Sequence, residues 1–205
     1  MEAPGPLRAV RSWEEVDPDR GADDAVLETM LLTVGELGYA KTTVREVCER
    51  ARIAQDRFHR RFESKEACFA RAYVEAATRL AADIELACRA SASWREGFRA
   101  GLAELLRFVS EQPLLAKALL IEVRAARGDA WDAHQRQLIG ATHAIERART
   151  QPGARPDASP MTAGFIAGAI EESLSIELAT GRAEAVPFLL DDLSRLAFLQ
   201  LFGEE

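Results

Sequence analysis

The fold is decided by residues 43–62, which have the sequence TVREVCERARIAQDRFHRRF. Thr43 and Glu46 form a Thr-x-x-Glu capping box, in which the threonine hydroxyl accepts from the backbone N–H of Glu46 and the glutamate reaches back to the N–H of Thr43. A short helix is therefore predicted from Val44 to Ala51. A second helix is predicted from Gln55 to Phe62, after a turn of about three residues, which is the connection length of a helix-turn-helix.

The second short helix has two chemically different faces. Phe58 and Phe62 are four residues apart, so they share one face and are expected to pack against the core. The opposite face is polar and rich in arginine, which pairs with guanine in a major groove, as glutamine does with adenine. The alternative for this helix on its own is a solvated face. The predicted DNA-contacting residues are Thr43, Arg45, Gln55, Asp56, Arg57, His59, Arg60, Arg61 and Lys65, of which Thr43, His59 and Lys65 suit phosphates.

The net charge of −7 excludes a uniformly basic nucleic-acid binder, but the charge is unevenly distributed. Residues 1–40 carry −6, residues 41–71 carry +4 and residues 72–205 carry −5. The positive segment is the one that contains the two short helices. A local basic patch therefore remains where the helix-turn-helix needs it.

Apolar residues recur at spacings of three and four almost throughout the chain, and no convincing period-two strand is visible. Alanine, leucine, arginine and glutamate all favour helix, so an all-α fold is predicted. Residues 1–22 are expected to form a flexible tail, with an arm carrying Arg8 and Arg11 into a minor groove as the alternative. Helices are expected at 23–37, 44–51, 55–62, 65–89, 94–111, 113–127, 130–149, 161–179 and 184–202.

Residues 24–70 resemble the DNA-binding domain of TetR/AcrR-type transcriptional regulators. The resemblance is carried by Val26-Leu27, Gly38-Tyr39, Thr42-Thr43-Val44-Arg-Glu-Val47, Ala51-Arg-Ile53 and Phe62-Glu-Ser-Lys65-Glu66. It implies a cytoplasmic homodimer that binds a palindromic double-stranded DNA operator. Most such proteins are repressors that a small-molecule effector releases from DNA.

The sequence departs from the family pattern at three positions of the helix-turn-helix. Ala54 stands where serine usually caps the second helix, Asp56 where glycine is common, and His59 where tyrosine is frequent. These departures keep open an alternative function, an all-α protein-interaction module with a degenerate helix-turn-helix that no longer binds DNA.

The resemblance also implies the domain order: a tail at 1–22, a three-helix DNA-binding domain at 23–70, and a ligand-binding and dimerisation domain at 71–205, joined by the long helix 65–89. An apolar effector pocket is predicted from Trp94, Phe98, Phe108, Trp131, His134 and Phe165, with core packing as the alternative. The dimer interface is predicted from Gly164, Gly168, Leu189, Leu193 and Leu196, with packing within one chain as the alternative.

No catalytic, metal or cofactor site is predicted. A di-iron bundle needs Glu-x-x-His pairs, and the sequence has none. Neither a P-loop nor a Ser/His/Asp pattern is visible. The three cysteines lack zinc-ligand spacing and are expected to be reduced and to pack as small apolar residues. Neither a signal peptide nor a membrane-spanning segment is expected.

Overall fold

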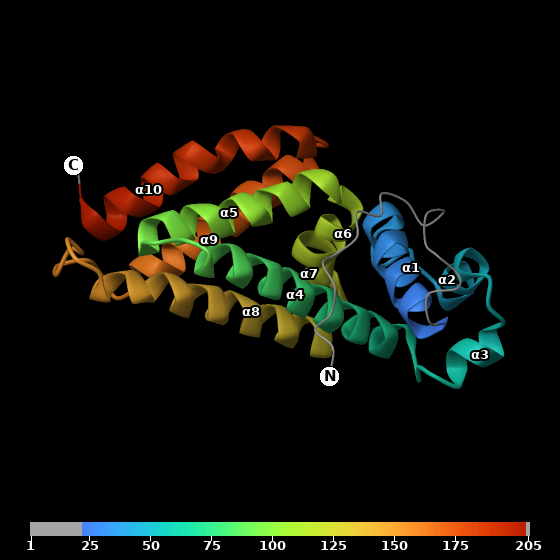
Figure 1. Cartoon of the computed structure of the whole chain (residues 1–205). Helices are drawn as coiled ribbons and strands as arrows, with labels where there is room; N and C mark the ends of the chain where they lie inside the picture. The colour runs from blue at the N-terminus through green and yellow to red at the C-terminus, as the bar shows by residue number, and fades with distance from the viewer. Residues whose placement is uncertain (1–21, 204–205) are drawn as a thin grey trace. The chain divides into compact units, whose positions relative to one another are not determined.

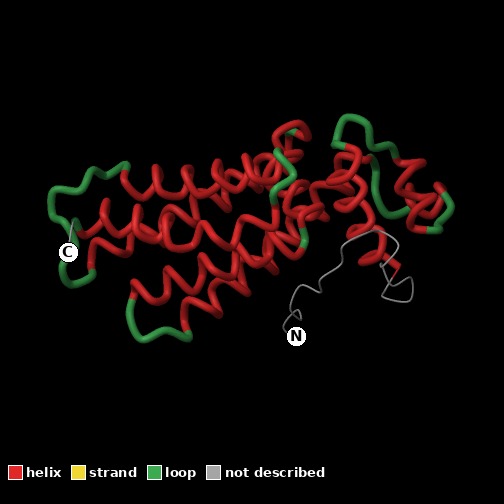
Figure 2. Tube along the Cα trace, turned by 90° about the horizontal axis from the view of Figure 1, so that it is seen from above, coloured by secondary structure: helices red, strands yellow, loops and turns green. Residues whose placement is uncertain are grey.

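The computed structural model describes residues 22–203, so the predicted tail and its Arg8 and Arg11 lie outside the described residues. The described part consists of helices joined by loops and contains no strand (Figure 2). The predicted all-α fold is confirmed. None of the helices in this part is long and apolar enough to cross a membrane.

Ten α-helices and three other helical segments follow one another in the described residues (Figure 1). They are α1 (Ala22–Leu37), α2 (Val44–Ala51), α3 (Gln55–His59), α4 (Lys65–Arg89), α5 (Trp94–Glu111), α6 (Pro113–Lys117), η2 (Ala118–Glu122), α7 (Val123–Ala126), α8 (Gly128–Glu146), η3 (Arg147–Thr150), α9 (Thr162–Ala179), η4 (Ala183–Leu189) and α10 (Leu190–Phe202). The predicted bounds of α2, α4 and α5 are confirmed to the residue.

The chain packs as two compact units. Unit 1 is Met1–Arg79 with Glu111–His134, and its described part holds α1 to α3, the start of α4, α6, η2, α7 and the start of α8. Unit 2 is Leu80–Ser110 with Gln135–Glu205, and its described part holds most of α5, the remainder of α4 and α8, and η3, α9, η4 and α10. The predicted functional boundary near residue 70 stays a prediction, whereas packing groups residues 111–134 with the N-terminal helices.

Helix α1 is buried on more sides than a single apolar stripe requires. Leu31, Leu32 and Thr33 are all buried, because α2 packs on α1 as do α6 and η2. A Cβ atom added at Gly35 would lie 2.0 Å from the carbonyl oxygen of Leu114. Only glycine permits this close approach of α1 to α6, so Gly35 sets the spacing of the two helices.

Three of the predicted helices differ from the structure in length or in helix type. Helix α3 ends at His59, and the chain continues as a turn in which the N–H of Arg61 bonds to the carbonyl of Phe58, three residues back. The predicted helix 113–127 is interrupted by the π-helical segment η2, whose sequence contains no proline or glycine that would have indicated it. The predicted helix 184–202 begins instead as the 3₁₀ segment η4, where Pro187 has no N–H to donate.

Candidate nucleic-acid interface

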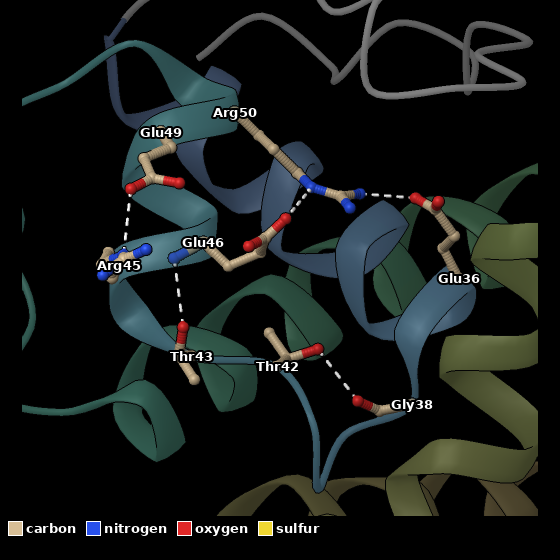
Figure 3. A network of polar contacts seen from close by, with 8 residues as sticks. All are labelled: Glu36, Gly38, Thr42, Thr43, Arg45, Glu46, Glu49 and Arg50. Atoms are coloured by element: carbon tan, nitrogen blue, oxygen red, sulfur yellow. Dashed lines mark hydrogen bonds and ion pairs between the residues drawn. The ribbon is translucent and has the colours of Figure 1, made fainter.

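The start of α2 has the threonine cap that the sequence predicts. The Oγ1 atom of Thr43 accepts from the N–H of Glu46 at 3.1 Å, and Thr43 has extended backbone angles (Figure 3). The predicted return bond, from the N–H of Thr43 to the Glu46 carboxylate, is not formed. That carboxylate accepts instead from Nε of Arg50 at 2.8 Å. Thr43 is exposed at the tip of the helix, where its hydroxyl and the free N–H groups suit a phosphate.

Two of the basic residues on α2 are neutralised within the unit. Arg50 is largely buried and joins α2 to α1 by binding the carboxylates of Glu46 and Glu36 (Figure 3). Arg45, a predicted DNA contact, forms an ion pair with Glu49 at 3.0 Å, although both side chains are exposed. Contact of Arg45 with DNA therefore requires that it share its charge with Glu49 or leave it.

The turn between the helices comprises Arg52, Ile53 and Ala54, as the sequence predicts. Arg52 has left-handed backbone angles, φ 54° and ψ 42°. The N–H of Arg52 bonds to the carbonyl of Glu49, and the N–H of Ile53 to that of Cys48. This pair of bonds is a Schellman motif, which ends α2 and turns the chain sharply into α3. Ala54 gives α3 no side-chain cap, in agreement with the departure seen in the sequence.

Helix α3 buries one aromatic side chain, and a second aromatic side chain that follows the helix packs beside it. Phe58 is 0% exposed and Phe62 is buried beside it, with ring centroids 5.2 Å apart. The remaining predicted contacts from α3 and the turn that follows it are all exposed: Gln55, Asp56, Arg57, His59, Arg60 and Arg61. The aromatic pair thus anchors α3 while leaving a continuous set of hydrogen-bonding side chains outside.

Lys65 is drawn toward the protein more than the sequence suggests. Its Nζ atom donates to the backbone carbonyl of Tyr39 at 3.0 Å and lies 4.1 Å from the centroid of the Tyr39 ring. The N–H of Tyr39 donates to Glu122 at 2.8 Å, and its hydroxyl donates to Glu66 at 3.3 Å. Burial and the Glu66 carboxylate raise the pKa of Tyr39 to about 12. The connection between α1 and α2 is therefore held by side chains from α4 and η2.

The six residues predicted to bind an effector fall into separate groups. In unit 1, His134 is buried, its Nδ1 lies 3.1 Å from the hydroxyl of Tyr73, and Trp131 stacks on its ring. In unit 2, Trp94 and Phe98 stack on each other and contact Phe198. Phe108 is buried, whereas Phe165 is 68% exposed on α9. Neither unit by itself collects more than two of the six in ring contact.

One small surface pocket lies in unit 1 and contains none of the predicted effector residues. It is lined by α1, α4 and Leu115 of α6, through Asp24, Leu27, Glu28, Leu31, Ala72, Glu75, Ala76 and Arg79. Its volume of about 40 Å³ suits one or two water molecules. Among residues 22–203, no three histidine, cysteine or acidic side chains are arranged to hold a metal ion.

The residues predicted for a dimer interface lie in α9, η4 and α10 of unit 2. Leu193 is buried, Gly168 and Leu189 are half-buried, and Gly164 and Leu196 are exposed. A Cβ atom at Gly164 would meet only a methyl of Thr142 at 4.0 Å, and at Gly168 it would meet nothing. Sequence reasoning missed several exposed apolar neighbours, whose exposure cannot be read from composition: Met161, Ile176, Phe188 and Leu199.

The cysteines are free thiols in the described structure. Burial raises the pKa of Cys48, Cys68 and Cys88. Cys88 packs against α5, where a Cβ atom at Gly101 would lie 2.5 Å from its sulfur. These three side chains fill space, as the sequence predicts.

Residues 34–72 match the family model of bacterial regulatory proteins of the tetR family. The match runs from the end of α1 through α2 and α3 into α4, and so covers the helix-turn-helix described above. A comparison with curated protein sequences finds no relative.

Solved structures share the fold over most of the chain. The fatty acid degradation regulator FadR from Bacillus halodurans has a TM-score of 0.78 and 14% identity, covering 86% of this chain and 94% of that one. FadR from Bacillus subtilis in complex with stearoyl-CoA has a TM-score of 0.76, 14% identity, and coverage of 88% and 98%. SmeT, the repressor of the Stenotrophomonas maltophilia multidrug efflux pump SmeDEF, has a TM-score of 0.72, 17% identity, and coverage of 90% and 92%. The helix-turn-helix of this chain therefore matches the model of the tetR family, and most of the chain shares the fold of these three regulators.

Proposed function

We propose that the protein is a ligand-responsive transcriptional repressor that binds a palindromic operator as a homodimer and is released by a small-molecule effector. The observation that carries the proposal is α3, whose aromatic back is fully buried while its front presents Gln55, Arg57 and Arg60 to solvent. A short helix of this kind can enter a major groove and read base edges.

Free positive charge on the helix-turn-helix supports DNA as the partner. Within the described residues, Lys41, Arg52, Arg57 and Arg60 are exposed and form no ion pair, whereas Arg45 and Arg50 are paired. Unpaired cations release no bound carboxylate when they meet phosphate, so their full charge contributes to binding. SmeT, a structural neighbour, is described as a repressor, which supports the same role here.

A homodimer is supported by α9 and α10 of unit 2. Met161, Phe165, Gly168 and Ile176 recur at spacings that place them on one side of α9, and Leu196 and Leu199 share a side of α10. Large exposed apolar patches mark association surfaces, and the open space beside Gly164 and Gly168 allows a second helix to approach closely. A two-fold dimer would present two copies of α3 to successive major grooves.

The chemical character of the effector is proposed by analogy with one of the structural neighbours. The FadR structure from Bacillus subtilis contains stearoyl-CoA, which combines a long apolar chain with a polar end. We propose an effector of the same general character, with His134 as a candidate polar contact. Native mass spectrometry of the protein purified from cells would reveal a bound molecule of this kind.

The test of DNA binding is its dependence on salt. The full-length protein is titrated onto a labelled duplex from the region upstream of its own coding sequence, between about 50 and 200 mM salt. Affinity is expected to fall steeply, with a log–log slope near −0.9 for each phosphate contact. Binding that does not respond to salt, or no binding, would contradict the repressor and favour the protein-interaction alternative.

A further inference from the structure

Arg52 occupies a backbone conformation that normally belongs to glycine. It lies at the left-handed position of the Schellman motif that ends α2, with φ 54°. Glycine is the usual residue there because a Cβ atom is strained at positive φ. Of the seven described residues with positive φ, five are glycine, and the exceptions are Arg52 and Arg127. The chain therefore keeps an arginine where glycine would be more stable.

The packing of the turn does not explain why arginine is kept. The side chain of Arg52 is exposed, and it forms no ion pair or side-chain hydrogen bond with any described residue. Its backbone bonds to Glu49 and Cys48 would form equally well with glycine. Strain that brings no gain within the folded chain points to a role outside it.

The position of Arg52 indicates what that role is. The N-terminal residues of a recognition helix meet base edges, so the turn just before it lies beside the phosphates that wall the groove. Arg52 is three residues before Gln55, the first residue of α3. Arg57 and Arg60, which follow the turn in the chain, are likewise exposed and form no ion pair, so Arg52 adds a further free cation to the helix-turn-helix.

We propose that Arg52 is a phosphate-binding residue, which clamps the DNA backbone at the edge of the major groove that receives α3. The inference rests on the proposed DNA-binding function and adds a contact that the sequence did not indicate. Because the contact is to phosphate, it is made on every duplex regardless of its sequence.

The test compares stability with DNA binding in one variant. Arg52→Gly removes the strain and the charge together, so its thermal midpoint is expected to rise by about 2–4 °C while its DNA affinity falls about threefold. The log–log salt slope should become shallower by about 0.9 for each protomer bound. The probe is a labelled random-sequence duplex of about three helical turns, read by fluorescence anisotropy.

Two variants serve as matched controls. Arg127→Gly removes the other exposed arginine with φ 54° from the same unit, outside the helix-turn-helix, and should raise the midpoint with no change in salt slope. Arg52→Lys keeps the charge and should keep the slope. A wild-type slope in Arg52→Gly, or an equal loss in Arg127→Gly, overturns the role of Arg52. If the wild-type protein itself shows no salt-dependent binding, the proposed function fails, and Arg52 with it.

Discussion

The exposed face of α3 is polar, whereas the exposed faces of α9 and α10 carry large apolar side chains. In the helix-turn-helix, the apolar Phe58 and Phe62 are buried and the charged residues of α3 are exposed, as is usual for a protein in water. In unit 2 this pattern is broken, because the apolar side chains of Phe165, Phe188 and Leu196 are all more than half exposed. The first surface is polar and well solvated, as a surface that binds a charged partner is, whereas the second leaves large apolar side chains in water, as association surfaces do.

The largest expected effect comes from charging the apolar surface. The double variant Phe165→Glu with Leu196→Glu should convert a dimer into a monomer at micromolar concentration, because two buried carboxylates per protomer would face apolar groups. Analytical ultracentrifugation measures the change. In an isolated chain both positions are exposed, so the fold itself should survive.

Leu86→Glu is the matched control for this variant, because Leu86 is as exposed as Phe165 but lies on α4. It should leave the dimer intact. A double variant that still sediments as a dimer would move the interface away from α9 and α10.

An intermediate effect is expected from the charged surface. Arg60→Ala should cost about 1–3 kcal/mol on the preferred operator and much less on random duplex, because a base contact is lost. Lys65→Ala should instead weaken binding to all duplexes alike, because a contact from an ammonium group to the DNA phosphates does not depend on the base sequence. Competition binding against random and operator DNA distinguishes the two. An equal loss on both duplexes would remove Arg60 from the base-reading residues.

The smallest effect is expected at the missing cap of α3. Ala54→Ser should raise the stability of the protein by about 1 kcal/mol, because its hydroxyl can accept from an unpaired N–H at the start of the helix. Thermal denaturation followed by circular dichroism gives the change. Ala54→Val, which has no capping oxygen, is the control, and an equal gain in that variant would exclude capping as the cause.

Features that depend on neighbours in the sequence were predicted well. The Thr43 cap, the bounds of α2 and α4, and the inward pair Phe58 and Phe62 all follow from spacings of three or four residues. The partners of the charged residues were not predictable in the same way. Glu46 binds Arg50 rather than the helix start, and Lys65 reaches Tyr39 from 26 residues away.

The effector residues illustrate the same limit. Trp94, Trp131 and Phe165 are all aromatic residues on predicted helices. In the structure, Trp94 stacks on Phe98, Trp131 stacks on His134, and Phe165 is exposed to solvent. Which aromatic side chains share a cluster depends on contacts between helices far apart in the chain. Periodicity reports only which face of a helix is apolar, and not what covers that face.

By itself, the sequence determined the all-α class, the helix-turn-helix and the polarity of its two faces, because capping, turn length and helical periodicity are local interactions. Only the tertiary structure decided that η2 interrupts the helix after Pro113, that the cations of α2 are neutralised, and that Phe188 and Leu196 remain uncovered. It also revealed the left-handed backbone at Arg52. These features arise where segments distant in the chain meet, or where the backbone adopts a conformation that the residue type disfavours, and neither is written in local spacing.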